Sequence, residues 1–445
     1  MDRELRKELL HWRDRKERMP LLIRGARQVG KSYLTEAFGR DEFEFFASVN
    51  FELKPEYGAC FRSLDPADII PQLEGVCKTR IIPGKTLLFF DEIQNCPRAL
   101  MSLRYFKEKW PQLHVISAGS LLEFTIEDEK FSFPVGRIQF LYLKPLSFKE
   151  FLLAKGEDGL LKLLAQTSLA NPLGEGLHLR LLALLKSYFF TGGMPSCVQS
   201  FLQENSFLEC QRIHEAILGN YQSDFGKYAS KSQNKYLQRL FEKAPRLVGQ
   251  NFKFNKIDPD MRSRELKVAL EQLGYAGLIQ RVHAVSASGI PLKSQMKENK
   301  FKLLFLDIGL LQTSLQTDPQ EILNQDLLQI NSGVLAEQFV GQELLAYADP
   351  YRKEDLFFWE REQYSSSAQV DYVIVLGSQI VAIEVKSGKT GKLKSLHLFM
   401  SEKKANLGVR ISQNPLSFKE NILSVPFYMI DQLPRLVKEL TRISG

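Results

Sequence analysis

A phosphate-binding pattern lies near the start of the sequence. It reads G-x-x-x-x-G-K-S and consists of Gly25, Ala26, Arg27, Gln28, Val29, Gly30, Lys31 and Ser32. The glycines would let backbone N–H groups converge on phosphate oxygens, Lys31 would reach the β- and γ-phosphates, and Ser32 would hold Mg²⁺. The preceding residues read as a buried strand and the following ones as a helix, whose N-terminus would face the same phosphates. The pattern therefore predicts a nucleotide site with Mg²⁺.

A second apolar strand, residues 86–92, ends in the carboxylates of Asp91 and Glu92. Ligands of open α/β sheets bind at the carboxyl ends of the strands. We expect Asp91 to fix Mg²⁺ through Ser32 or through a water molecule. Glu92 would polarise the water that attacks the γ-phosphate. The two acidic residues thus supply the groups that the phosphate loop lacks.

Two further residues have open interpretations. Ser120 follows a third strand, residues 113–120, where it reads equally well as a γ-phosphate sensor or as a turn serine. Arg137 reads either as an arginine finger, which would neutralise charge that develops during phosphoryl transfer, or as a surface arginine.

A hairpin pattern far along the chain brings two carboxylates and an ammonium together. Apolar, β-branched residues flank Gly377-Ser378, which predicts a two-residue turn. In that register Asp371 faces Glu384. Lys386 follows on the same face, because strand side chains repeat every second residue. Opposed carboxylates are destabilising unless a divalent cation lies between them or water surrounds them. The segment reads as a Mg²⁺ or Mn²⁺ site or as a solvated charged strand.

The elements that would position these groups fall into four regions. Strand and helix patterns alternate at first, which predicts a parallel sheet with helices on both faces. Helical patterns follow, and then a helix, a strand, a turn and a strand in the order of a winged helix-turn-helix. A new alternation begins near residue 331. The chain is predicted to be an α/β protein with a P-loop core, a helical lid, a winged-helix region and a C-terminal α/β domain, at residues 1–145, 146–215, 216–325 and 326–445.

The composition is that of a globular protein, with 44% of the 445 residues hydrophobic and 25% charged. The net charge of +7 is a mild bias toward polyanionic partners. Five scattered cysteines without a Cys-x-x-Cys pair argue against a disulfide framework and favour a reducing cytosol. The N-terminal residues are too charged for a secretory signal, and no stretch is apolar enough to span a bilayer. We therefore expect a cytoplasmic protein that does not enter a membrane.

Several segments together resemble a known prokaryotic family. The stretches PLLIRGARQVGKSYL, LLFFDEIQ, AGSLLE and GRIQFLYLKPLSFKEFL are similar to those of AAA-type ATPases that carry a C-terminal domain of unknown function, DUF4143. The later stretches YFFTGGMPSCV, RSRELKVALEQLGYAGLI and FKLLFLDIGLL continue the resemblance in order. It implies a core that binds and hydrolyses ATP with Mg²⁺, a helical lid, a winged-helix module and a nuclease-like end. It also favours the arginine-finger interpretation of Arg137.

The last segment resembles the PD-(D/E)xK nuclease fold, in which a helix supplies a Glu, a hairpin an Asp and the next strand a Glu-x-Lys. The matching residues are Glu337, Asp371, Glu384 and Lys386. The resemblance implies that the three carboxylates bind Mg²⁺ or Mn²⁺. Lys386 would orient the attacking water or stabilise charge on the phosphate. One position departs from the family pattern, because Gln369 stands where a Glu is usual.

The functional interpretations differ in the role of this C-terminal segment. In the first, the ATP cycle controls a metal-dependent DNA nuclease. The candidate DNA contacts are Arg262, Arg264 and Lys267, and the basic residues from Lys389 to Arg410 would follow a phosphate backbone or form a solvated surface. In the alternative, ATP drives the binding of nucleic acid or of a protein partner without cleavage. The complete set of Glu337, Asp371, Glu384 and Lys386 favours the first, and assembly into a homo-oligomer is left open.

Overall fold

The protein is described from a computed structural model. The structure describes residues 1–120, 136–317, 332–361, 368–388 and 391–443. The chain divides into two compact units. Unit 1 comprises Met1–Lys144, Tyr275–Gly277 and Asp349–Lys353, and unit 2 comprises Pro145–Gly274, Leu278–Ala348 and Glu354–Gly445. Within the described residues, no helix combines the length and the apolar character that a membrane span needs.

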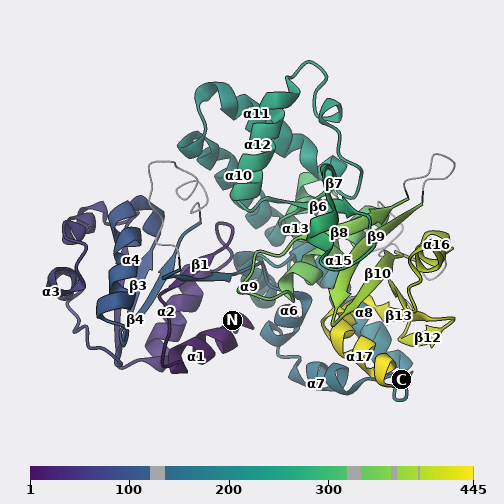
Figure 1. The fold of residues 1–445 in the computed structure, drawn as a ribbon, viewed down its shortest axis with the longest axis horizontal. Helices are drawn as coiled ribbons and strands as arrows, with labels where there is room; N and C mark the ends of the chain where they lie inside the picture. Colours follow the sequence, from purple (N-terminus) through teal and green to yellow (C-terminus); the bar gives the residue numbers. More distant parts are fainter. Residues whose placement is uncertain (121–135, 318–331, 362–367, 389–390, 444–445) are drawn as a thin grey trace. The chain divides into compact units, whose positions relative to one another are not determined.

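Unit 1 is built around a five-stranded parallel sheet with the strand order β2-β3-β4-β1-β5 (Figure 1). The strands are β1 (Leu21–Arg24), β2 (Phe45–Asn50), β3 (Thr86–Asp91), β4 (His114–Ala118) and β5 (Gln139–Tyr142). Helix α1 (Leu5–Asp14) precedes the sheet, and the helices between its strands are α2 (Lys31–Glu42), α3 (Pro66–Cys77) and α4 (Pro97–Lys109), with short 3-10 helices η1 (Pro55–Phe61) and η2 (Ile93–Asn95). The parallel sheet predicted for the first 145 residues is therefore present.

Helices cover both faces of this sheet. Successive side chains of a strand point to opposite faces, so a strand of apolar residues needs cover on both. On one face Phe46 packs so closely against α2 that a Cβ added to Gly39 would lie 2.3 Å from its ring. On the other face α3 and α4 share an apolar core with the sheet, which includes Val49, Leu88, Phe90, Ile69, Leu103 and Phe106. Burial of both faces leaves the carboxyl ends of the strands as the edge where polar groups can collect.

Unit 2 combines helices with an eight-stranded mixed sheet of order β12-β13-β11-β10-β9-β8-β6-β7. The strands are β6 (Ile279–Val285), β7 (Met296–Phe305), β8 (Leu356–Glu360), β9 (Gln369–Leu376), β10 (Gln379–Val385), β11 (Gly408–Ser412), β12 (Ser417–Lys419) and β13 (Ile422–Pro426). The helices before the sheet are α6 (Phe148–Ala154), α7 (Asp158–Gln166), α8 (Glu175–Thr191), α9 (Pro195–Glu204), α10 (Phe207–Tyr228), α11 (Lys231–Lys243) and α12 (Ser263–Tyr275). Those between or after its strands are α13 (Ile308–Ser314), α15 (Ser332–Ala346), α16 (Lys394–Lys403) and α17 (Leu433–Ile443). Short 3-10 helices are η3 (Ala244–Leu247), η4 (Phe254–Lys256), η5 (Leu292–Gln295) and η6 (Phe427–Gln432).

The hairpin β6–β7 follows α12 in the order predicted for a winged helix. It is nevertheless part of the C-terminal sheet, because β6 also pairs in parallel with β8, from Val282↔Leu356 to Val285↔Trp359. The predicted division at residues 325 and 326 therefore does not separate two sheets. The backbone N–H and C=O groups along one edge of β8 need partners, and β6, a strand from much earlier in the chain, provides them. Periodicity along the sequence carries no information about such a partner.

Buried carboxylates tie the helices of unit 2 to its sheet. Asp307, just after β7, accepts hydrogen bonds from the backbone N–H groups of Gly193, Gly309 and Leu310 at 2.6, 2.9 and 3.1 Å. Glu343 on α15 accepts from the backbone N–H of Phe148, at the start of α6, at 3.0 and 3.2 Å. These bonds satisfy N–H groups at the starts of α13 and α6, which have no partner within their own helices.

The raised pKa of Glu343 predicts that rising pH destabilises unit 2. Glu343 is buried, and burial raises its pKa from the usual 4.5 to about 8. The folded protein therefore binds more protons than the unfolded chain between these values, so the free energy of unfolding falls as the pH rises through them. Glu343→Gln keeps an acceptor for Phe148 N–H but cannot ionise. We expect its urea midpoint to fall less than that of the wild type between about pH 5 and about pH 8.

The control for this comparison is Glu175→Gln, which removes an exposed carboxylate from α8. Its urea midpoint should follow the wild-type pH profile. A Glu343→Gln profile parallel to that of the wild type would contradict the assignment.

Candidate functional site

The backbone of residues 25–32 has the shape that a phosphate loop requires. Gly25, Gln28 and Gly30 have positive φ angles of 150°, 66° and 95°. At Gly25 a Cβ would lie 2.2 Å from the carbonyl oxygen of Leu143, so no side chain fits there. The loop connects β1 to the N-terminus of α2, as predicted, and three backbone positions that most L-residues avoid lie within it.

Lys31 lies in the first turn of α2 and is only 5% exposed. Its Nζ donates to the carbonyl oxygens of Gly25 and Ala26, at 2.9 and 2.8 Å. The ammonium is thus held inside the loop, where a phosphate would meet it. The remaining loop residues support this shape: Arg27 lies 3.5 Å from Glu52, and the carbonyl of Val29 accepts a hydrogen bond from Arg3 at 2.9 Å.

Asp91 is the centre of the polar cluster at the ends of the strands. Ser32 Oγ lies 3.0 and 2.9 Å from its two carboxylate oxygens, and Asn50 Nδ2 donates to Oδ2 at 2.8 Å. Burial raises the pKa of Asp91, and the neighbouring charge of Glu92 adds to the rise. The hydroxyl and carboxylate oxygens of Ser32 and Asp91 are the ligands that Mg²⁺ prefers, so the predicted pair fits that ion.

Asn50 was not predicted from the sequence. It is the last residue of β2 and lies opposite Asp91 in the parallel register with β3. Its side-chain oxygen also accepts the backbone N–H groups of Glu52 and Leu53 at 3.0 and 2.9 Å, which fixes the turn after β2. Its position at the end of a strand could have marked Asn50 as a site residue. Only the pairing of β2 with β3 shows that it lies beside Asp91.

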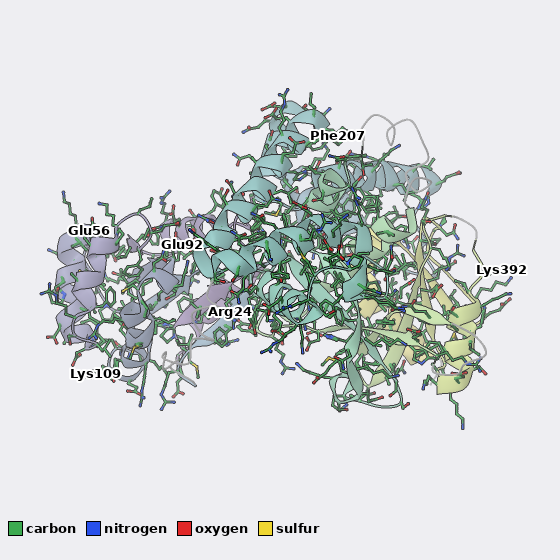
Figure 2. The ribbon with its side chains drawn as sticks, turned by 90° about the horizontal axis from the view of Figure 1, so that it is seen from above. Arg24, Glu56, Glu92, Lys109, Phe207 and Lys392 are labelled. Carbon is green, nitrogen blue, oxygen red and sulfur yellow. The ribbon has the colours of Figure 1, made fainter. Side chains whose placement is uncertain are left out.

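Glu92 follows β3 in the left-handed conformation, with φ 48° and ψ 47°. Non-glycine residues rarely adopt this conformation, and such strain is found most often at functional sites. Its Oε2 accepts from Gln94 Nε2 at 2.5 Å and lies 3.4 Å from Ser120 Oγ. Glu92, which is labelled in Figure 2, therefore contacts both Asp91, through its backbone N–H, and Ser120, through its carboxylate.

Arg137 has a different neighbour. Its Nε lies 3.2 Å from Glu108 Oε1 on α4, and its side chain is 48% exposed. The guanidinium thus forms an ion pair with Glu108 and does not contact Glu92. Its role as an arginine finger, toward the same chain or a neighbouring subunit, stays a prediction.

In unit 2, the hairpin has the register that its sequence predicts. β9 and β10 pair from Gln379↔Leu376 to Ile383↔Tyr372, which places the turn at Gly377-Ser378. The pairing ends at Ile383↔Tyr372, and this register continued by one residue would bring Asp371 opposite Glu384. Asp371 Oδ2 accepts the backbone N–H of Val385 at 2.8 Å. The two carboxylates are therefore neighbours across the hairpin, as expected.

A β-bulge changes the setting of Asp371. Val370 and Val373 of β9 pair with Trp359 and Phe357 of β8, so two residues on β9, Asp371 and Tyr372, lie opposite one on β8. A bulge re-aims side chains and interrupts their alternation. The bulge lies in the pairing of β9 with β8, whereas the pairing of β9 with β10 has the predicted register without a shift. Gln369, the position that departs from the family pattern, lies just before the bulge and pairs with Glu360.

A residue that was not predicted, Lys302, occupies the centre of the C-terminal cluster. Its Nζ lies 2.6 Å from Glu337 Oε1 and 3.7 Å from Asp371 Oδ1. Lys386 Nζ lies 2.6 Å from Glu384 Oε1. Burial by itself would lower the pKa of Lys302, but Glu337 and Asp371 raise it above its usual value, so this lysine stays charged. Nothing in the local sequence around Lys302 indicated its partners.

Two carboxylates of this cluster, Glu337 and Glu384, have raised pKa values. Burial raises the pKa of Glu337, and Asp371 adds to the rise while Lys302 opposes it. Burial likewise raises the pKa of Glu384, with a further rise from Asp371. Among the residues that the structure describes, no three His, Cys, Asp or Glu side chains are arranged to hold a metal ion. The metal-binding arrangement predicted for Glu337, Asp371 and Glu384 is therefore not found there, and lysines contact these carboxylates instead.

The candidate DNA contacts lie partly at the surface. Arg262, Arg264 and Lys267, at the start of α12, are exposed. Arg410 is different, since its Nε is buried and burial lowers the pKa of its guanidinium. Arg410 is therefore only partly exposed. Lys389 lies outside the described residues.

Family models match three successive segments of the chain. Residues 17–152 match an AAA domain. Most of unit 1 is therefore similar to an AAA-type ATPase domain, and the match extends into the first residues of unit 2. Residues 332–429 match the domain of unknown function DUF4143, and residues 182–321 match another, DUF8612. The predicted resemblance to AAA-type proteins with DUF4143 is confirmed, while DUF8612 was not predicted. No curated protein matches the chain.

The chain has only low similarity to the solved structures that it matches. The Aeropyrum pernix ORC1 protein in complex with DNA is 13% identical, with a TM-score of 0.29, over 72% of this chain and 94% of that chain. The Thermotoga maritima RuvB Holliday junction branch migration motor is 15% identical, with a TM-score of 0.31, over 63% of this chain and 90% of that chain. Similarity at this level does not carry the function of either protein to this one.

The geometry of the loop predicts that Gly25→Ala abolishes nucleotide binding. The added methyl group would collide with the carbonyl of Leu143, and the φ of 150° is unsuitable for alanine, so the loop must change shape. We expect ATP affinity to fall at least about tenfold in titrations with a fluorescent ATP analogue. Gly75→Ala is the matched control, because a Cβ there meets nothing within 4 Å. Equal affinity of both variants would contradict the proposed loop function.

Proposed function

We propose that this protein binds and hydrolyses ATP at residues 25–32 and the adjoining strand ends. The observation that carries the proposal is the contact of Ser32 Oγ with both carboxylate oxygens of Asp91, at 3.0 and 2.9 Å. It joins the phosphate loop to the acidic strand end in the way a Mg²⁺–nucleotide site requires. The match of residues 17–152 to an AAA domain supports the same conclusion.

Each residue has a distinct task in this proposal. Lys31 and the N–H groups of the loop bind the β- and γ-phosphates, and Ser32 and Asp91 would hold Mg²⁺, which neutralises phosphate charge when bound. Glu92 orients the attacking water and accepts its proton on a carboxylate oxygen. Gln94 and Ser120, which both contact Oε2 of Glu92, keep that carboxylate in position. Asn50 holds Asp91 in place through its amide group.

The proposal predicts two different defects. Lys31→Ala removes the charge that meets the phosphates and should abolish ATP hydrolysis. Glu92→Gln keeps the shape of the side chain but cannot take a proton, so it should bind ATP and hydrolyse it about 10²–10⁴-fold more slowly. ATP affinity and steady-state phosphate release would be measured for both variants. Hydrolysis at the wild-type rate by Lys31→Ala would refute the assignment.

The second candidate is nucleic-acid binding without cleavage. It is favoured over the nuclease interpretation by the lysines that pair with the C-terminal carboxylates, since a metal-dependent nuclease needs those carboxylates for its metal. The candidate contacts are the exposed Arg262, Arg264 and Lys267. In this role ATP would control the affinity for DNA, and the C-terminal domain would contribute to binding without cleaving the DNA.

DNA binding through α12 predicts a salt-dependent loss of affinity. We expect the triple variant Arg262→Ala, Arg264→Ala and Lys267→Ala to bind a duplex oligonucleotide more weakly, with a salt slope reduced by about one per lost phosphate contact. Gel shifts at several salt concentrations, with and without ATP, measure both quantities. The control variant Lys162→Ala, Lys231→Ala and Lys419→Ala loses the same charge from exposed positions elsewhere. Equal losses in both variants would show a general charge effect and contradict the assignment to α12.

A further inference from the structure

The C-terminal carboxylate cluster already contains a cation, and that cation belongs to the protein. Lys302 Nζ lies 2.6 Å from Glu337 and 3.7 Å from Asp371, and its side chain is only 3% exposed. We propose that the ammonium of Lys302 is the permanent cation of this cluster and takes the place of the divalent metal that Glu337, Asp371 and Glu384 would otherwise bind. The proposal concerns unit 2 alone and is independent of ATP hydrolysis.

The path of the chain holds Lys302 firmly in this position. It lies in β7, where it pairs with Val282 of β6, and its ammonium is 5.3 Å from the centre of the Phe358 ring. A buried lysine of this kind is held by backbone pairing and ring contact as well as by charge. With only 3% of its side chain exposed, Lys302 has little solvent to move into.

Glu337 is fixed just as closely. Its backbone carbonyl accepts the Tyr372 hydroxyl at 2.8 Å, which ties this turn of α15 to β9. A Cβ added to Gly249 would lie 3.1 Å from Glu337 Oε2, so the backbone of Gly249 approaches that oxygen. Mg²⁺ needs near-octahedral coordination and usually keeps several water molecules. Lys302 contacts one carboxylate oxygen of Glu337, and Gly249 lies on the side of the other.

Three carboxylate oxygens of the cluster have a hydrogen-bond partner, and one buried oxygen has none. Glu337 Oε1 and Glu384 Oε1 each contact a lysine, and Asp371 Oδ2 accepts from Val385 N–H. Glu384 Oε2 is buried and has no hydrogen-bond partner among the residues that the structure describes. This oxygen is where the cluster would gain most from a metal ion. The nearby ammonium of Lys302 opposes such binding by charge repulsion.

Lys386 provides the comparison that separates a specific role from a general charge effect. It belongs to the Glu-x-Lys pattern and also pairs with a carboxylate of the cluster, but its side chain is 27% exposed, against 3% for Lys302. The partly exposed Lys386 can turn toward solvent when a metal ion binds, whereas Lys302 is almost fully buried. Removing the charge of Lys302, and not that of Lys386, should therefore create a metal site.

The test is Mn²⁺ binding to the purified full chain without nucleotide or DNA. Electron paramagnetic resonance measures free Mn²⁺ during titration of the wild type, Lys302→Met, Lys386→Met and the double variant Lys302→Met with Glu384→Gln. We expect Lys302→Met to bind one additional Mn²⁺ at least about tenfold more tightly than any site of the wild type in unit 2. Lys386→Met should resemble the wild type, and the double variant should lose the gained site. The melting temperature of Lys302→Met should also rise with Mn²⁺, since a ligand of the native state stabilises it.

Two outcomes would overturn the proposal. One is a folded Lys302→Met protein, judged by its circular dichroism, that gains no Mn²⁺ site. The other needs no lysine variant: wild-type protein that binds Mn²⁺ at a site abolished by Glu384→Gln would show that the cluster accepts a metal beside Lys302. The second measurement decides the question even if Lys302→Met does not fold. Equal Mn²⁺ binding by the wild type and Glu384→Gln supports the proposal.

Discussion

A buried carboxylate must be matched by hydrogen-bond donors or by a cation, and this constraint determines the character of both acidic sites in the protein. In unit 1 the partners of Asp91 are the hydroxyl of Ser32 and the amide of Asn50, which are neutral. Neutral donors hold the carboxylate in place without cancelling its charge, so it can still attract a divalent cation. A third neutral donor is the backbone N–H of Glu92, which lies 3.1 Å from Asp91 Oδ1. In the proposed nucleotide site, the charge of Asp91 would therefore be available to a cation.

Unit 2 satisfies the same constraint in the opposite way. Its carboxylates at Glu337 and Glu384 each contact an ammonium at 2.6 Å. Two unit charges of the same sign separated by about 4 Å repel each other by about 4 kcal/mol at an effective dielectric constant of about 20, and a divalent ion doubles this cost. Removing one partner from a buried ion pair is also strongly destabilising, because the remaining charge has no compensation. The cluster is therefore stable as it stands and unfavourable for a metal.

The sequence predicted those parts of both sites that are determined by adjacent residues. The phosphate loop is contiguous, and its glycines and Lys31 have fixed tasks. The hairpin register followed from the Gly377-Ser378 turn. What could not be predicted depends on pairing between distant segments. Asn50 meets Asp91 only because β2 lies beside β3, Lys302 meets Glu337 only because the β6–β7 hairpin joins the C-terminal sheet, and the bulge at Asp371 arises from pairing with β8. Charge at one position does not reveal its partner when the partner lies on another strand.

The two sites also show why a motif alone is weak evidence for chemistry. Glu337, Asp371, Glu384 and Lys386 match the nuclease pattern in type and spacing, and Asp371 and Glu384 are neighbours as the pattern requires. The pattern does not include Lys302, which lies on a strand from a segment matched by a different family model. A motif specifies which groups are available, whereas the charges that surround them decide what they can bind. In unit 1 those surroundings leave Asp91 able to take a cation, and in unit 2 the same kind of carboxylate is already occupied by one.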